Sequence, residues 1–421
     1  MKTTLFFITL LVLVALQSFG QEVKIDAEIR SRAEVRDGFI EPLADSLNVA
    51  YVNNLRTKLN LSYKHNEIKA KLSIIEARTY GSTSTSSTGN GLGVLEAWGE
   101  YAFTPELSFA IGRQGLEYDD KRLFSYNNWS NTPGAHDLLL LKYTTSGFTV
   151  HLGSAYNNAG DSLHFLSPYR QAYKTLNFIW LGKQVGKLST SAIWINDSYE
   201  NGSTGNIDRS YRNTIGGNIG LNDKKSHTTF AVGGYYQFGR DRQDKSLRAF
   251  LLSAKVQQQF SGIWSAQIGS DVFSGSKNDI ASNKNNTFNK LYGTNHAFNG
   301  SIEYWAIPPS QGLIDIYAGV TAKPSSKFNI NLTYHHFSTA KEIAPEYGKG
   351  IGSEIDITTN YIVSSQFAIQ GGWSSYFTTE ETDILKRKTG VDTRFPQWAY
   401  VQLTFTPVFM NKKIRPLINF N

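Results

Sequence analysis

The sequence contains no cysteine among its 421 residues, which excludes disulfide bonds, thiolate metal sites and cysteine nucleophiles. Charged residues are sparse at 18%, and apolar residues reach only 40%. Because soluble globular domains usually have about 45–50% apolar residues, a large conventional core is not expected. Aromatic residues are abundant instead, with 25 Phe, 22 Tyr and 8 Trp beside 36 glycines. This composition favours many strands joined by turns.

Long apolar runs are missing everywhere except at the N-terminus. There, Lys2 precedes an apolar stretch from Leu5 to Leu16, and small residues follow up to Gly20. This order predicts a secretory signal peptide at residues 1–20 that is cleaved after Gly20. The alternative, a membrane anchor, would need about 20 apolar residues. No later segment could form a transmembrane helix, so the mature chain is expected to be either soluble or a closed β-barrel, because lipid accepts no other strand arrangement.

The rest of the chain repeats a two-residue alternation of apolar and polar side chains. In one segment, Leu59 and Leu61 alternate with Lys58, Asn60 and Ser62. This pattern predicts a strand with one apolar and one polar face. Eighteen segments show the pattern or a variant of it: 22–35, 50–63, 66–79, 92–104, 106–117, 135–144, 147–156, 172–183, 186–196, 207–221, 226–239, 246–260, 263–273, 312–323, 327–338, 350–362, 366–377 and 397–407.

The connections between these segments alternate in length. Short turns such as Lys64-His65 follow even-numbered segments. Long loops follow odd-numbered segments, at 36–49, 80–91, 118–134, 157–171, 197–206, 274–311, 339–349 and 378–396, with a shorter charged link at 240–245. Bacterial outer-membrane barrels have an even number of strands, short periplasmic turns and long outer loops. The predicted fold class is therefore all-β: a transmembrane antiparallel up-and-down β-barrel of about 18 strands over residues 21–407, with a periplasmic tail at 408–421.

Basic side chains in such a barrel must face the lumen, because a Lys or Arg that faces lipid at mid-membrane costs roughly 2–4 kcal/mol. Gly112-Arg113 is interpreted as a β-bulge that turns Arg113 inward. Two interpretations of the lumen charges are equally open: a cationic track for an anionic solute, or a ladder of ion pairs that stiffens the wall. The candidate pore-lining residues on this basis are Arg30, Arg32, Arg56, Lys58, Lys69, Lys71, Glu96, Glu100, Arg113, Asp315, His335, Glu354 and Asp356.

Eighteen strands enclose more space than side chains fill, so passive diffusion of solutes through a hydrated lumen is the expected function. The long loops 118–134 and 274–311 are expected to fold inward or to cap the mouth, because loops of this length usually carry function. The expected partners are outer-membrane lipid and an anionic small solute or acidic saccharide.

Catalytic signals are weak. His335-His336 places its two rings on opposite faces of a strand, where they could not chelate one ion together. The glycine-rich stretch 89–93 precedes a strand, whereas a phosphate cradle needs a helix start. No cofactor, metal or nucleic acid is expected, and the chain is not expected to be an enzyme. The alternative is an outer-membrane barrel enzyme or a secreted carbohydrate-binding β protein.

Several stretches resemble the alginate export family of outer-membrane barrels. The first comprises Leu95-Glu96-Ala97-Trp98, then Ile111-Gly112-Arg113-Gln114-Gly115-Leu116-Glu117-Tyr118-Asp119-Asp120, and then Arg122, Trp129 and His136-Asp137. The others are Tyr292-Gly293-Thr294-Asn295-His296, Phe298-Asn299-Gly300, Gly312-Leu313-Ile314-Asp315 and Gly352-Ser353-Glu354-Ile355-Asp356. The resemblance implies an 18-stranded porin-like barrel that passes alginate or other anionic polysaccharides through an arginine-lined constriction. The site residues that it implies are Glu96, Arg113, Asp120, Arg122 and Asp137.

Overall fold

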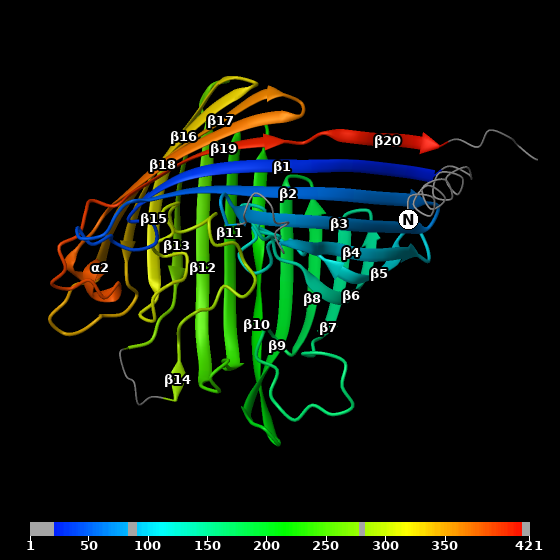
Figure 1. Ribbon diagram of the computed structural model, residues 1–421, viewed down its shortest axis with the longest axis horizontal. Coiled ribbons are helices and arrows are strands. Elements are labelled where there is room, and N and C mark those ends of the chain that lie inside the picture. The colour runs from blue at the N-terminus through cyan, green and yellow to red at the C-terminus, as the bar shows by residue number, and fades with distance from the viewer. Residues whose placement is uncertain (1–20, 83–90, 278–282, 415–421) are drawn as a thin grey trace, which may run out of the picture.

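The computed structural model describes residues 21–82, 91–277 and 283–414, so the predicted signal peptide lies outside the described residues. The described chain forms one closed antiparallel barrel (Figure 1). Nine wall strands come from the first half: β1 (Gln21–Asp37), β2 (Ala50–His65), β3 (Ile68–Thr79), β4 (Leu92–Ala102), β5 (Leu107–Gln114), β6 (His136–Thr145), β7 (Phe148–Tyr156), β8 (Thr175–Val185) and β9 (Leu188–Ser203). Nine follow: β10 (Asn206–Asp223), β11 (Thr228–Arg240), β12 (Ser246–Gln259), β13 (Trp264–Phe273), β15 (Leu313–Ser325), β16 (Phe328–Ser338), β17 (Gly350–Ser364), β18 (Phe367–Phe377) and β19 (Gln397–Phe405).

Each wall strand pairs with the next one in the chain, and β19 pairs with β1 to close the ring. Closure gives both sides of every wall strand a hydrogen-bonding partner, which is the condition for strands to cross lipid. Each of the eighteen predicted segments overlaps one wall strand, in the predicted order. The predicted fold class is therefore confirmed.

Alternation along the strands separates an apolar outer surface from a polar lumen. Leu59 on β2 and Leu332 on β16 are exposed on the outside, at 44% and 48%. Their neighbours Lys58 and Asn331 face inward, where Lys58 contacts Glu28 of β1. No helix among the described residues is long and apolar enough to cross a bilayer.

Part of the lumen is filled by apolar side chains. Inward residues of β6 and β8, such as Leu138, Leu140 and Phe178, are buried against Phe124 and Leu123 of the β5–β6 loop. The strands in this sector are apolar on both faces, which is why the facing of segments 135–144 and 186–196 is not readable from the sequence. The loop expected at 118–134 thus folds into the barrel over this apolar sector.

Two expected boundaries are corrected. The loop expected at 197–206 is instead the end of a long hairpin, because β9 and β10 stay paired up to Ser203 and Asn206, and this hairpin projects beyond its neighbours (Figure 1). The barrel wall was expected to end at residue 407, but β20 (Val408–Ile414) continues past β19 and pairs with β1. The physical reason is that the first residues of β1 need a second hydrogen-bonding neighbour.

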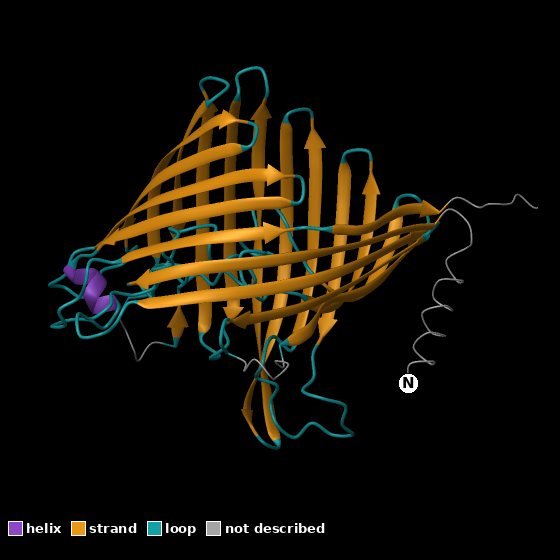
Figure 2. Cartoon of the chain, turned by 45° about the horizontal axis from the view of Figure 1, so that its top comes forward, coloured by secondary structure: helices purple, strands orange, loops and turns teal. Residues whose placement is uncertain are grey.

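Most of the long loops meet at one rim. The β18–β19 loop carries the short helix α2 (Glu380–Leu385), which lies among neighbouring loops at that rim (Figure 2). Lys386, just after α2, donates to the carbonyls of Ile40 and Tyr304 at 2.8 and 2.6 Å. The two-residue strand β14 (Lys284–Asn285) lies in the β13–β15 loop and pairs with the start of β12. The rim loops therefore bind one another rather than standing apart.

The outer surface can be tested with a matched pair of arginine substitutions. Leu332→Arg places a charge in the apolar belt and is expected to lower the free energy of unfolding by about 2–4 kcal/mol. Asn331→Arg, one residue away on the lumen face, is expected to change it by about 0.5 kcal/mol or less. Urea unfolding in lipid vesicles measures both, and equal losses would contradict the assignment of faces.

Candidate functional site

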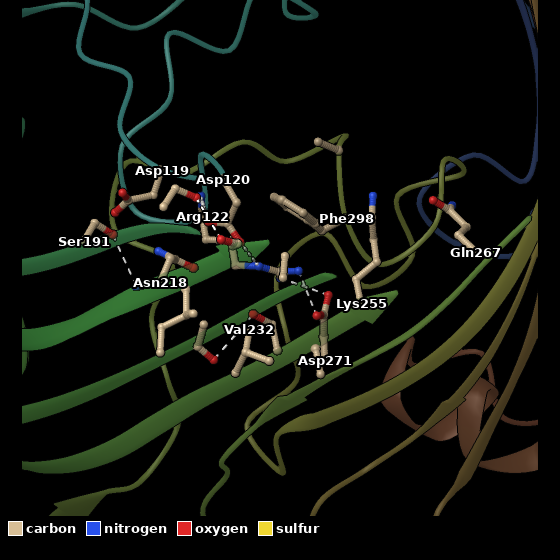
Figure 3. Close-up of a pocket in the computed structure, with 18 of the residues that line it drawn as sticks. Asp119, Asp120, Arg122, Ser191, Asn218, Val232, Lys255, Gln267, Asp271 and Phe298 are labelled. Atoms are coloured by element: carbon tan, nitrogen blue, oxygen red, sulfur yellow. Dashed lines mark hydrogen bonds and ion pairs between the residues drawn. The ribbon is translucent and has the colours of Figure 1, made fainter. Parts of the chain in front are cut away.

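The lumen contains a cavity of about 930 Å³ that is lined by Asp119 and Arg122 of the inward loop (Figure 3). It extends toward the short turn at Gly147. This volume is at the upper end of the range for small-molecule sites, about 300–1,000 Å³. Uncharged polar side chains make up much of its wall: Ser191, Asn218, Ser253, Gln267, Asn331, Thr333 and Thr358. The cavity is therefore suited to a hydrated or hydroxyl-rich solute.

Two loops narrow the lumen above this cavity by pairing with each other. Phe124 of the β5–β6 loop forms an isolated parallel bridge with Tyr292 of the β13–β15 loop. The Ser125 amide donates to the Tyr292 carbonyl at 3.0 Å, and the Thr294 amide donates to the Lys121 carbonyl at 3.2 Å. This arrangement agrees with the expectation that these loops fold inward or cap the mouth.

Aromatic stacking holds another part of the β5–β6 loop, around Trp129, against strand β19. The Trp129 and His296 rings are nearly parallel, with centroids 3.9 Å apart. Trp129 also meets Trp398 and Tyr400 of β19 edge to face, at 6.1 and 5.0 Å. The constriction is thus built jointly from two loops and the last wall strand.

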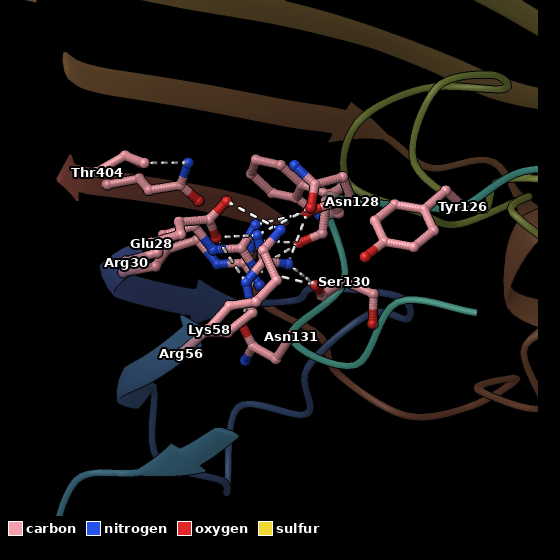
Figure 4. Close-up of polar contacts among 12 residues, drawn as sticks. Glu28, Arg30, Arg56, Lys58, Tyr126, Asn128, Ser130, Asn131 and Thr404 are labelled. Carbon is pink, nitrogen blue, oxygen red and sulfur yellow. Dashed lines mark hydrogen bonds and ion pairs between the residues drawn. The ribbon is translucent and has the colours of Figure 1, made fainter. Parts of the chain in front are cut away.

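Arginines of the first two strands clamp this loop through its backbone carbonyls (Figure 4). Arg30 donates to the carbonyls of Asn128, Trp129 and Ser130 at 2.6, 3.0 and 2.9 Å. Arg56 donates to the carbonyls of Asn128 and Ser130 at 2.9 and 2.8 Å, and it forms an ion pair with Glu28.

Arg32 completes this arginine cluster. Its guanidinium lies 4.2 Å from the Trp129 ring centroid and bonds Glu34 at 2.9 Å. Arg30, Arg32 and Arg56 are 3%, 6% and 0% exposed. These predicted pore-lining residues do lie on the lumen side, but their charged ends are covered by the loop that they hold.

The predicted lysines of the same wall are paired with acids. Lys58 lies 3.5 Å from Glu28, Lys71 lies 2.5 Å from Glu96, and Lys69 lies 2.8 Å from Glu100. Glu100 also binds Lys142 at 2.7 Å. Along β1–β4 the ladder of ion pairs therefore describes the geometry better than a track of free cations.

Arg122 binds the β5–β6 loop to strand β13 of the barrel wall. Its two terminal nitrogens donate to both oxygens of Asp271 at 2.8 and 2.7 Å, and Nε donates to Asp120 at 2.7 Å. Its guanidinium lies 3.8 Å from the Phe298 ring centroid. Burial opposes the charge, but the two carboxylates raise the pKa of Arg122 above its ordinary value. Arg122 is thus a fixed, neutralised cation.

The predicted acids on β15–β17 gather around His335. The ring Nδ1 of His335 bonds Asp315 at 2.9 Å, and Nε2 lies 3.6 Å from Asp356. Glu354 is fully buried and accepts the amide of Ile302 at 2.8 Å, so it holds the β13–β15 loop. Among the described residues, no three acidic or histidine side chains are placed to hold a metal ion.

The prediction that Arg113 turns inward is wrong. Arg113 lies opposite Ala97 and Asp137 on the face that carries Ile111, which is 55% exposed on the outside. Arg113 and Asp137 form an ion pair at 2.9 Å on this outer face, near the loop rim where β5 ends and β6 begins. Gly112 has a φ of +119° but does not shift the register, so ordinary alternation continues through it.

Sequence reasoning missed several residues of the lumen cavity. Lys255 on β12 and Trp180 on β8 line it, and Asp119 accepts the Trp180 indole N–H at 3.0 Å. The alternation over 246–260 does place Lys255 on the inner face of β12. Leu252, an odd number of residues away, lies on the outer face of the same strand and is 53% exposed. The position of Asp119 depends on the inward path of a loop, which alternation does not report.

Comparisons with known proteins agree with this geometry. The family model for alginate export matches residues 17–378. No curated protein matches the sequence. Similar solved structures include Acinetobacter baumannii OccAB4 (TM-score 0.64, 11% identity, 94% of this chain and 99% of that one). They also include Pseudomonas aeruginosa OccK9 (OpdG; TM-score 0.64, 9% identity, 92% and 98%) and the P. aeruginosa outer membrane protein OpdK (0.62, 10%, 92% and 99%). At these identities the structures show a shared fold.

The arginine clamp can be tested by removing one lumen charge in two ways. Arg56→Met frees the carbonyls of the loop, and we expect a larger, noisier single-channel conductance because the constriction loosens. Lys69→Met removes the same charge without touching the loop, so its conductance is expected to stay close to that of the unaltered protein. Planar-bilayer recording compares the two variants. Indistinguishable conductances would contradict the clamp.

Proposed function

The chain belongs to the alginate export family and is a channel of the outer membrane, and on that premise we propose that it passes anionic solutes, with acidic oligo- or polysaccharides such as alginate as the solute class. The family and the barrel indicate transport rather than catalysis. The proposed mechanism is diffusion through a hydrated lumen whose fixed charges favour anions.

The observation that carries the proposal is the position of Lys255. Its side chain extends from β12 into the lumen cavity, toward Phe298 (Figure 3). It forms no ion pair with any carboxylate in the described part of the chain. A cation without a counter-charge in a low-dielectric cleft attracts anions into that cleft.

Most acids of the same cavity are already engaged by a side chain of the protein. Asp120 and Asp271 both bind Arg122, and Asp315 and Asp356 both lie beside His335. Asp119 has no cationic partner among the described residues, but burial raises its pKa, which favours its neutral form. Lys255 is therefore a lining cation that no carboxylate of the described residues already binds, and we expect it to attract the anionic group of a solute to this part of the cavity.

The remaining cavity wall supports a sugar as the solute. Hydroxyl and amide side chains from β9, β10 and β16, including Ser191, Asn218 and Thr333, offer partners for sugar hydroxyls. Trp180 and Tyr317 add aromatic faces on which the apolar face of a sugar ring can pack. A carboxylated sugar would use both kinds of contact and the Lys255 charge.

Reversal potentials under a salt gradient test the proposal. The unaltered channel is expected to prefer anions, and Lys255→Glu is expected to shift the reversal potential toward cation preference, because it reverses the charge inside the cavity. Lys224→Glu changes the net charge equally in an exposed short turn and is expected to leave the potential unchanged. A cation-preferring unaltered channel would overturn the proposed anion function.

A further inference from the structure

A second cavity, of about 510 Å³, lies on the loop side of the constriction. Its walls come from the β9–β10 hairpin, the β11–β12 loop and the β13–β15 loop. Gly293 and Asn295 line this outer cavity, while His296 lines the lumen cavity. The segment 293–296 therefore forms the partition between the two cavities.

Two cations on the outer cavity lack a carboxylate partner within the described residues. Lys290 donates to the Thr294 carbonyl and to Asn295 Oδ1 at 3.0 and 3.1 Å, both on the partition. Arg242 donates to the Arg170 carbonyl and lies 5.5 Å from the Tyr199 ring centroid.

The other charged groups of this cavity already have partners within the protein. Arg212 is tied to Asp197 by an ion pair. Asp241 accepts the Asn285 amide at 2.7 Å and the backbone amides of Gln243 and Lys245 at 2.9 and 2.8 Å. The charges of Lys290 and Arg242 therefore stand against that of Asp241, which leaves one positive charge in excess in the outer cavity.

We propose that Lys290 and Arg242 form an outer binding site for the carboxylate of an acidic sugar unit, at the loop-side end of the solute path. The inference rests on the proposed function and adds a defined site to it. Carboxylates are bound most strongly by ionised N–H donors, and both residues supply them. Gln243, Asn285 and Asn289 offer amides for sugar hydroxyls, and Leu291 and Pro308 offer apolar contact.

The site also carries its own dependence on pH. Burial lowers the pKa of Lys290 to about 8, with Glu303 acting against this shift and Arg122 reinforcing it. Glu303 is itself bound to His296 at 3.0 Å. Lys290 is thus mostly charged at pH 7 and mostly neutral at pH 9, so carboxylate binding weakens as the pH rises through 8. An arginine at this position would stay charged at both pH values.

Current block by a mannuronate hexamer added on the loop side tests the site, with a neutral mannose hexamer as the reference solute. At pH 7, Lys290→Met and Arg242→Gln are each expected to weaken block about tenfold, since each removes a charged hydrogen bond. Lys341→Met, an exposed lysine of the β16–β17 loop, is expected to leave block unchanged. At pH 9 block of the unaltered channel is expected to fall about tenfold, while Lys290→Arg retains it.

The outcomes separate this site from the function on which it rests. A cation-preferring reversal potential would overturn the function. An anion-preferring channel that the hexamer does not block, or whose block changes no more in Lys290→Met and Arg242→Gln than in Lys341→Met, would overturn the outer site alone. A β-sheet circular dichroism spectrum and heat-modifiable migration in SDS gels, both like those of the unaltered protein, show that each variant has folded.

Discussion

Closure of the backbone hydrogen-bond ring between β1 and β19 is the constraint on which the rest of the structure depends. With every wall strand paired on both sides, the backbone is satisfied inside the wall, and the side chains alone decide what faces outward and inward. Leucines can then cover the outside while arginines, glutamates and amides occupy the bore. The same constraint explains β20, which continues the pairing along the free start of β1.

The side-chain interactions inside the ring have two distinct roles. On β1 and β2 the arginines bind loop carbonyls, and on β3 and β4 the lysines are paired with glutamates. The arginines hold the constriction, whereas the lysine–glutamate pairs lie along the barrel wall. Lys255, Lys290 and Arg242 line the two cavities without such counter-charges among the described residues, and they are therefore available to act on a solute. The lumen thus contains many charged side chains, but most of them are bound to other groups of the protein and few are available to a solute.

Much of the fold can be predicted from the period-two alternation of polar and apolar residues, because successive side chains of a paired strand must point to opposite faces of the sheet. This is why all eighteen wall strands could be placed and why Lys58 and Lys71 could be assigned to the lumen. It fails where both faces are apolar, as at Leu138–Leu141, because the inner face there packs against a loop and not against water. It also cannot distinguish an arginine that lines open space from one, such as Arg56, that a loop covers.

Arg113 shows a different limit of prediction from the sequence. A glycine beside an arginine suggests a bulge, but Gly112 adopts its positive φ without adding a residue to the register. The ion pair with Asp137 is tolerated on the outside because it lies near the loop rim, where the expected cost of a charge is small, about 0–1 kcal/mol. The length of the two inward loops suggested that they fold inward or cap the mouth, but the path of each depends on contacts between residues far apart in the chain.

The stacking of Trp129 on His296, and of both against Trp398, joins parts of the chain that are made at very different times. Trp129 follows the fifth strand, whereas Trp398 belongs to the strand that closes the cylinder. During biogenesis the inward loop therefore cannot reach its final seat until the C-terminal segment has been inserted. The final packing of the inward loop thus needs the strand that closes the cylinder, so completion of the constriction and closure of the wall are coupled.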